Sequence, residues 1–391
     1  MTIDALMVAS IREGVFPGAV LLFSRGGQIL SHRAYGQQSL LTHTPVTLET
    51  CFDLASLTKP LATALAVAKL VEGGILDLDQ PLGSLLDCGG HDNKKPITID
   101  QLLRHTSGFP AHRPFYSLLA RMPREDRRQA LRRLIMAEPL IHCPGTRQVY
   151  SDLGYMVLAW IVESTTRMRL DQFVDKIFFT PLGLDLFFRP LGACDVSPRQ
   201  LKRFAATEHC PWRGRILTGE VHDDNAWAAG GVEGHAGLFG TAHAVEKLLC
   251  YVLAALQGTP IPQYPESQTQ PPAPSTQQQE PSPQNPIPTN PIPGRVLRKF
   301  VQKEPGRERV AGFDTPSLVG SSAGGGFSIQ ALGHLGYTGT SFWMEPDSCI
   351  IVVLLSNRVH PSRDNLKIRQ FRPRLHDAVM EKIKSDHNCF Q

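Results

Sequence analysis

The chain has 391 residues and a formal net charge of +4 at pH 7, and 42% of its residues are hydrophobic. This length suffices for one large core or for two closely joined domains. The small, dispersed charge argues against nucleic acid as a partner, and no apolar run approaches the ~20 residues needed to span a bilayer.

The eight cysteines are scattered without paired spacing, which suits a reducing compartment and free thiols. The first residues show neither the basic segment nor the long apolar segment of a secretory signal. We therefore expect a cytoplasmic protein.

Residues 18–30 contain the first predicted element. Two apolar runs flank Gly26-Gly27, a pattern that indicates two strands joined by a tight turn.

The stretch Ser56-Leu57-Thr58-Lys59 places a lysine three residues after a serine. On a helix this spacing puts the hydroxyl and the ammonium on one face. A lysine in a partly desolvated pocket can act as the base that activates a serine nucleophile. The alternative is a helix-capping serine followed by a solvated lysine.

A helix is predicted directly after this stretch. The run 61–71 is rich in Ala and Leu, Pro60 is tolerated in a first turn, and Gly73-Gly74 is a stop signal. Ser56 would then lie at a helix N-terminus, where backbone N–H groups can hold a developing oxyanion.

Two later segments strengthen the reading of Ser56 as a nucleophile. Tyr150-Ser151-Asp152 precedes an apolar run, 153–162, that indicates a helix. His334-Leu335-Gly336 precedes the short β-branched run 350–355, which is typical of a buried strand. With these three elements in this order, the chain resembles the penicillin-recognising serine hydrolases, which include class C β-lactamases, low-molecular-weight penicillin-binding proteins and related esterases.

The resemblance extends from about Gly14 to a C-terminal helix predicted at 369–384. It implies an α+β fold of the β-lactamase/transpeptidase kind. One antiparallel sheet would be built from both termini, approximately 10–55 and 310–388, and would be flanked by helices. A helical part, approximately 56–258, would be inserted into it, so that residues 1–391 form a single catalytic domain.

The resemblance also implies residue roles. Ser56 would be the acylated nucleophile, and Lys59 and Tyr150 would move its proton, with Tyr150 also protonating the leaving group. Lysine and tyrosine are both protonated in water at neutral pH, and the sequence leaves open which of them is the base. The oxyanion hole would be formed by the N–H groups of Ser56 and Tyr337.

The expected substrate-binding residues include two departures from the family pattern. Asp152 stands where Asn is usual, and the added charge would favour a protonated Lys59. His334 stands where Lys is usual and begins the His-Leu-Gly element that Gly336 completes. Both changes favour an esterase or a peptidase-like enzyme over a true β-lactamase.

Two cations are candidates for an anionic substrate group. If His334 provides the charge, activity on anionic substrates should rise as the pH falls through the imidazole pKa, near ~6.5 when unperturbed. Arg358, at the end of the 350–355 strand, is either a second contact for such a group or an ordinary surface arginine.

Two competing sites are less favoured by the sequence. Gly320-Ser321-Ser322-Ala323-Gly324 matches a nucleophile elbow, and Asp347 and His360 follow in the required order, but no helix start follows it. His222 to Asn225, together with His235, fits no zinc spacing. We expect no metal and no cofactor.

Residues 259–294 are rich in proline and glutamine and carry only two charged residues, Glu266 and Glu280. This composition predicts a disordered insertion.

The sequence therefore predicts a serine hydrolase that forms a covalent acyl-enzyme with a small ester, amide or β-lactam-like substrate. The alternative is a penicillin-binding-like scaffold without turnover. The sequence makes no prediction of the oligomeric state.

Overall fold

The computed structural model describes residues 2–192, 201–260 and 292–388. Most of the predicted disordered insertion, residues 261–291, lies outside these ranges. Within them, no helix combines the length and the apolar character needed to cross a membrane.

The largest sheet has five antiparallel strands in the order β2-β1-β10-β9-β8. The strands are β1 (Gly18–Arg25), β2 (Gln28–Gly36), β8 (Leu332–Leu335), β9 (Ser341–Glu345) and β10 (Ile350–Ser356). The predicted hairpin is present, and both residues of its turn, Gly26 and Gly27, have positive φ, as the tightest hairpin turns require. N-terminal β1 pairs with C-terminal β10, in the register Ala19 opposite Ser356, so both ends of the chain build one sheet.

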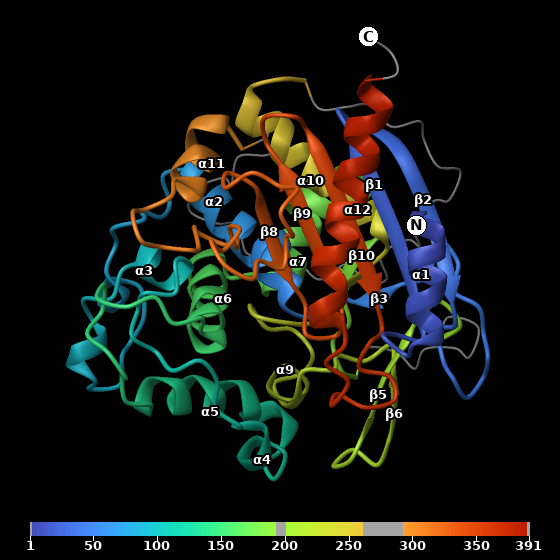
Figure 1. Cartoon of the computed structure of the whole chain (residues 1–391). Helices are drawn as coiled ribbons and strands as arrows, with labels where there is room; N and C mark the ends of the chain where they lie inside the picture. Colours follow the sequence, from blue (N-terminus) through green and yellow to red (C-terminus); the bar gives the residue numbers. More distant parts are fainter. Residues whose placement is uncertain (1, 193–200, 261–291, 389–391) are drawn as a thin grey trace.

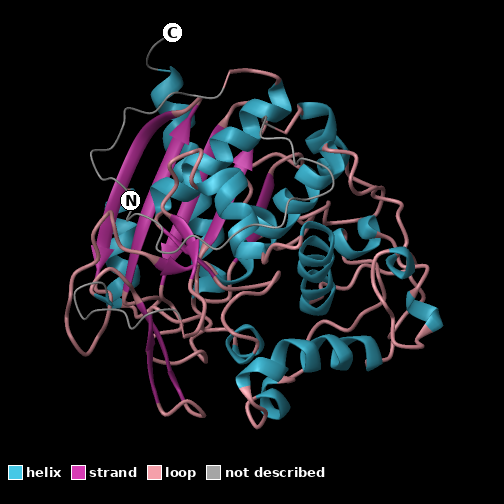
Figure 2. Ribbon diagram, turned by 180° about the vertical axis from the view of Figure 1, so that it is seen from behind, coloured by secondary structure: helices cyan, strands magenta, loops and turns pink. Residues whose placement is uncertain are grey.

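Helices cover the two faces of this sheet (Figure 1). One face packs against α1 (Ile3–Arg12) and α12 (Ile368–Asn388) in a core that includes Leu21, Trp343 and Leu375. On the other face, α10 (Ala242–Gln257) packs against β1 and β10, and α2 (Leu65–Glu72) and α6 (Asp152–Thr166) belong to the same hydrophobic core. Figure 2 shows from behind the helices that lie over this face of the sheet.

The middle of the chain provides the remaining helices. They are α3 (Ile99–Leu103), α4 (Tyr116–Leu119), α5 (Arg124–Ala137), α7 (Leu170–Val174) and α9 (Asp224–Ala228), followed later by α11 (Gly294–Val301).

Short strands also occur in the middle region, which the sequence predicted to be mostly helical, and just before it. β3 (Phe52–Asp53), β7 (Leu238–Gly240) and β4 (Leu186–Phe188) form one small sheet, and β5 (Ala206–Cys210) pairs with β6 (Arg215–Thr218). Strands of two to five residues are too short to show an alternating pattern. The α+β architecture with a sheet from both termini is confirmed.

Candidate active site

Ser56 lies in a tight turn, Ala55–Leu57, that directly follows β3. A wider helical turn, Lys59–Ala64, then leads into α2, so the predicted single helix begins irregularly. Ala55 has φ +49°, which is unusual for a residue with a side chain. Its N–H donates to Asp53 Oδ1 at 2.8 Å. The nucleophile is therefore presented by a strained turn that a buried carboxylate holds in place.

Lys59 is fully buried beside Ser56. Its Nζ donates to Ser56 Oγ at 3.1 Å, to Asp152 Oδ1 at 2.7 Å and to the carbonyl of His235 at 3.4 Å. Burial alone would lower the pKa of the lysine, but attraction by Asp152 and Tyr150 outweighs it, and the pKa is raised. The pKa of Asp152 is lowered despite burial, because Lys59 lies so close. At neutral pH the two residues form a charged pair.

Tyr150 completes the group around Ser56. Its hydroxyl interacts with both Ser56 and Lys59, and the Lys59 Nζ lies 4.6 Å from the centre of its ring. The ring of His105 lies behind it at 4.6 Å. Burial raises the pKa of Tyr150, against the opposing effect of Lys59. Both candidate bases are therefore protonated in the resting site at neutral pH.

Gly336 and Tyr337 belong to the turn between β8 and β9. A Cβ atom at Gly336 would lie 1.9 Å from Thr340 Oγ1 and 2.7 Å from the carbonyl oxygen of Leu54. Glycine is thus required for the close approach of this turn to the chain before Ser56. Among the described residues, the N–H of Tyr337 donates to no backbone carbonyl, so it is available to a ligand.

His334 and Arg358 are both nearly inaccessible to solvent, at 2% and 5% exposure. Burial lowers the pKa of His334 to about 4, and its Nδ1 donates to the carbonyl of Leu335 at 2.9 Å. His334 is therefore neutral at pH 7, contrary to its expected role as a titrating cation. The sequence left Arg358 as either a substrate contact or a surface arginine. The structure buries it, and it donates from Nε to the carbonyl of Tyr337 at 2.8 Å and from Nη1 to two further carbonyls.

Two residues that the sequence did not single out border the group around Ser56. The guanidinium of Arg309 lies 5.4 Å from the centre of the Tyr150 ring, and its Nε pairs with Asp314 at 2.7 Å. Its side chain is 30% exposed. His112 Nδ1 lies 3.7 Å from Asp152 Oδ2. Neither residue sits in a recognisable motif, so no local signal could have identified it.

The competing elbow around Ser322 does not assemble. No regular helix follows this turn, and His360 is engaged elsewhere: its Nε2 accepts from the N–H of Leu40, and its Nδ1 lies 2.7 Å from the carbonyl of Thr207. The two histidines weighed as metal ligands belong to two separate pairs. His222 Nε2 lies 3.0 Å from Glu208 Oε2, and His235 Nε2 lies 2.9 Å from Asp223 Oδ1.

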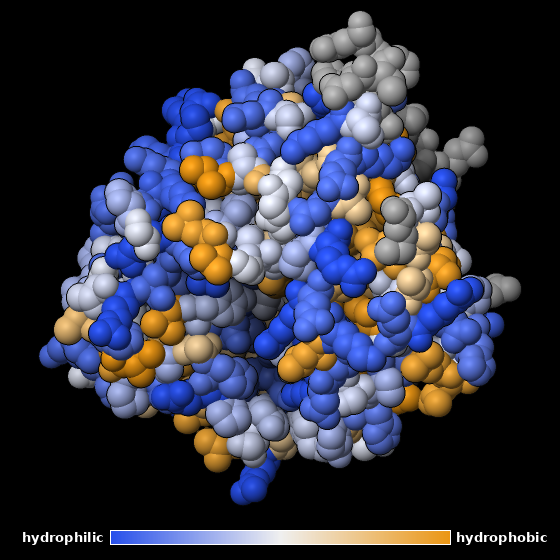
Figure 3. Space-filling model, in the orientation of Figure 1, coloured by the Kyte–Doolittle hydropathy of each residue, from blue (hydrophilic) through white to orange (hydrophobic). Residues whose placement is uncertain are grey.

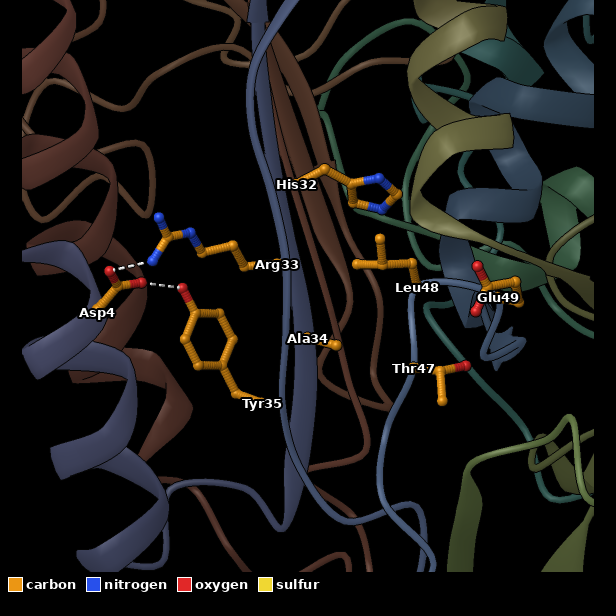
Figure 4. A pocket seen from close by; sticks show the side chains of 8 residues that line it. All are labelled: Asp4, His32, Arg33, Ala34, Tyr35, Thr47, Leu48 and Glu49. Carbon is orange, nitrogen blue, oxygen red and sulfur yellow. Dashed lines mark hydrogen bonds and ion pairs between the residues drawn. The ribbon is translucent and has the colours of Figure 1, made fainter.

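An open groove lies along β2, at the edge of the sheet opposite β8. In Figure 4, Arg33 and Tyr35 point toward Asp4, while His32 points to the other side of the strand, where Leu48 and Glu49 lie on a neighbouring segment. The Tyr35 hydroxyl donates to Asp4 Oδ1 at 2.6 Å. These contacts fasten α1 to the sheet, and none of the predicted site residues lines the groove.

The molecular surface is hollowed between the region of α6 and the lower ends of β8 and β10 (Figure 3). The group around Ser56 is built from elements on both sides of this hollow: Tyr150 precedes α6, and Tyr337 follows β8. A serine, a lysine and a tyrosine in mutual contact, beside an available backbone N–H, define a serine hydrolase that works through an acyl-enzyme.

Comparison with known proteins agrees with this class. The sequence profile described as "Beta-lactamase" matches residues 3–372. A protein of Salmonella agona (strain SL483) named "Putative D-alanyl-D-alanine carboxypeptidase" is 29% identical over 385 residues, which are 90% of this chain and 81% of that protein. The chain belongs to the Beta-lactamase family.

Solved structures show the same fold. One is "EstCE1, a hydrolase with promiscuous acyltransferase activity", with a TM-score of 0.67 and 20% identity over 95% of this chain and 97% of that chain. Another is the octameric penicillin-binding protein homologue from Pyrococcus abyssi, with a TM-score of 0.66 and 19% identity over 94% of this chain and 75% of that chain. The resemblance inferred from the sequence motifs is confirmed.

Proposed function

We propose that the enzyme hydrolyses small neutral acyl esters through an acyl group on Ser56, with penicillins as poor substrates. The contact that carries the proposal is the buried pair of Lys59 and Asp152 beside the Ser56 hydroxyl. A charged lysine stabilises negative charge on Ser56 Oγ, but it has no lone pair with which to accept a proton.

Tyr150 is then the proton carrier. As Ser56 Oγ attacks the acyl carbon, its proton passes to the Tyr150 oxygen, and the Tyr150 proton passes to the leaving alkoxide. The ester C–O bond breaks, an alcohol departs, and Tyr150 remains a neutral phenol. Water then attacks the acyl-enzyme by the reverse relay, which releases the acid and restores the Ser56 hydroxyl. The developing oxyanion is held by the N–H groups of Ser56 and Tyr337.

The charges around the hollow support a neutral substrate. His334 is neutral at pH 7, and Arg358 is buried against backbone carbonyls. Arg309 borders Tyr150 but is paired with Asp314. Asp152, which pairs with Lys59 and lies 3.7 Å from His112, adds negative charge to the site. An anionic substrate therefore meets Lys59 and Arg309, each of which is already paired with a carboxylate.

A labelling experiment tests the proposal. A fluorophosphonate should add to Ser56, as located by mass spectrometry, and Ser56→Ala should abolish the adduct while Ser322→Ala retains it. Lys59→Ala and Tyr150→Phe should each lower kcat by ~10²–10⁴-fold, the usual contribution of acid–base catalysis. An adduct on Ser322, or a penicillin hydrolysed faster than a p-nitrophenyl ester, would contradict the proposal. Labelling without turnover of any ester would favour the scaffold alternative.

A cytoplasmic location is part of the proposal. The six cysteines within the described ranges form no disulfide with one another, as a reducing compartment favours. Cell fractionation that places the native protein in the periplasm or outside the cell would refute it.

A further inference from the structure

The turn that carries the Tyr337 N–H is fixed to the chain just before Ser56. The Gly339 N–H donates to the Gly336 carbonyl at 3.1 Å and closes the turn. The Thr338 hydroxyl donates to the carbonyl of Asp53 at 2.7 Å, and the Thr340 hydroxyl donates to that of Leu54 at 3.0 Å. The two proposed oxyanion donors therefore belong to one hydrogen-bonded unit.

A buried arginine of α12 lies behind this turn. Arg372 Nη2 donates to the carbonyl of Gly336 at 3.1 Å and to the carbonyl of Thr340 at 2.7 Å. The Gly336 carbonyl and the Tyr337 N–H are the two ends of one peptide group. The arginine thus contacts the carbonyl end of the peptide whose N–H end is the proposed oxyanion donor.

Arg372 carries a charge that the fold does not neutralise. It is 5% exposed, and among the described residues no carboxylate lies within 4.0 Å of its guanidinium. Burial and the nearby Arg358 lower its pKa to about 9, so it remains a cation at pH 7. A buried cation without a counterion is costly. An apolar side chain could fill the same space at a smaller cost in folding free energy, so we expect the charge of Arg372 to have a function.

We propose that Arg372 is a positioning residue of the oxyanion hole, which orients and polarises the peptide between Gly336 and Tyr337 so that the Tyr337 N–H becomes a stronger donor. This inference rests on the proposed function. A hydrogen bond to a carbonyl strengthens the N–H of the same peptide, because bonded groups polarise one another. A charged donor strengthens this effect. The stronger hydrogen bond from the Tyr337 N–H takes effect as negative charge develops on the substrate oxygen.

The magnitude follows from what an oxyanion donor contributes. Losing one entirely lowers kcat by ~10²–10³-fold. Weakening one without removing it should lower kcat by about tenfold. KM should change little, because the ground-state carbonyl carries little charge.

The experiment compares Arg372→Met, which removes charge and donor, with Arg372→Lys, which keeps the charge. Arg104→Met is a matched control. Arg104 is also buried, and it also donates to two carbonyls, those of Lys299 and Gln302, but it does not touch the Gly336–Thr340 turn. We expect Arg372→Met to lower kcat for a p-nitrophenyl ester about tenfold with KM within twofold, and Arg372→Lys to recover most of the loss. Arg104→Met should lower the melting temperature and leave kcat within about twofold.

A spectroscopic measurement separates polarisation from loss of structure. In the acyl-enzyme, the infrared stretch of the ester carbonyl moves to lower frequency as hydrogen bonds to it strengthen. Arg372→Met should move this band to higher frequency, while Arg104→Met should not. If Arg372→Met does not fold, Arg372→Lys must show a smaller shift in the same direction.

The outcomes are distinguishable from failure of the proposed function. A wild-type enzyme that forms no adduct at Ser56 contradicts the proposed function itself. A wild type that turns over, together with an Arg372→Met variant whose kcat and carbonyl band are unchanged, overturns only the role of Arg372. The role of Arg372 is also overturned if Arg104→Met lowers kcat as much as Arg372→Met does.

Discussion

Replacing Asp152 by asparagine tests whether its carboxylate keeps Lys59 charged. The two charged atoms are 2.7 Å apart, and the side chains of Lys59 and Asp152 are 0% and 18% exposed. At an effective dielectric constant of about 20, two unit charges at this distance attract each other by about 6 kcal/mol. Asp152→Asn removes this attraction and leaves the burial of Lys59, so the pKa of the lysine falls.

The first expected result concerns stability. Breaking a buried pair leaves an uncompensated charge, so the free energy of unfolding should fall by about 3–5 kcal/mol at pH 7. In this variant, folded Lys59 binds its proton less tightly than unfolded lysine, whose pKa is ~10.4. Stability therefore rises with pH between the two values, and the deficit relative to wild type should be smaller at pH 9 than at pH 7. Urea unfolding of both proteins at pH 7 and at pH 9 measures this deficit.

The second expected result concerns the base. Once neutral Lys59 is populated, it can accept the Ser56 proton itself. Tyr150→Phe, expected to cost ~10²–10⁴-fold in the wild type, should then cost much less in the Asp152→Asn background. The assay is kcat/KM for a neutral p-nitrophenyl ester from pH 6 to 9, for the four proteins of this cycle.

Asp223→Asn is the control for the Asp152 cycle, because Asp223, whose side chain is 24% exposed, is also paired, with His235, but makes no ion pair with Lys59. It should leave the cost of Tyr150→Phe unchanged. Two results would refute the reasoning. One is that Tyr150→Phe lowers kcat/KM by the same factor with and without Asp152. The other is that the unfolding free energies of wild type and Asp152→Asn agree at pH 7.

Three further measurements follow from the charges near the hollow and from a buried histidine of α12. Because burial lowers the pKa of His334 to about 4, the ratio of kcat/KM for an anionic to a neutral ester should stay constant from pH 8.5 to 5.5; a rise through pH 6.5 would restore the role expected from the sequence. Arg309→Gln should lower kcat/KM for an anionic ester by tenfold or more, from a charged hydrogen bond of ~1.5–3 kcal/mol, and spare a neutral ester; equal losses would show that Arg309 only supports Tyr150. Burial also lowers the pKa of His376 to about 4, so between about pH 6.5 and 4 the unfolded chain binds more protons than the folded one. Stability therefore falls as the pH falls, by up to ~1.4 kcal/mol per pH unit for each such histidine. His376→Gln should reduce this slope in melting experiments from pH 7 to 5, and an unchanged slope would contradict the reasoning.

The sequence predicted those parts of the fold whose signals are local. The hairpin around Gly26 and Gly27 and the apolar strand 350–355 show their periodicity within a few residues, and both are present. The family motifs likewise placed Ser56, Lys59 and Tyr150 in one site, and the structure brings their side chains together.

Other features depend on contacts that no short segment records. Arg309 meets Tyr150 across about 160 positions of chain, and Arg372 reaches Gly336 from the C-terminal helix. The neutral state of His334 is set by burial, and burial is a property of the assembled fold. Arg358 shows the same limit: its position after β10 suggested a substrate contact or a surface arginine, yet it is buried and its Nε and Nη1 donate to backbone carbonyls.

The pairing of β1 with β10 also decides when the enzyme can become active. The N–H of Gly18 donates to the side chain of Asn357, 339 positions away, and closing so long a loop is slow compared with forming local structure. The turn that carries Tyr337 connects β8 and β9, which join the sheet through β10. During synthesis, Ser56 and Lys59 leave the ribosome long before that turn exists. Acylation by a fluorophosphonate should therefore begin only when the sheet closes, so the onset of labelling at Ser56 should report when that closure occurs.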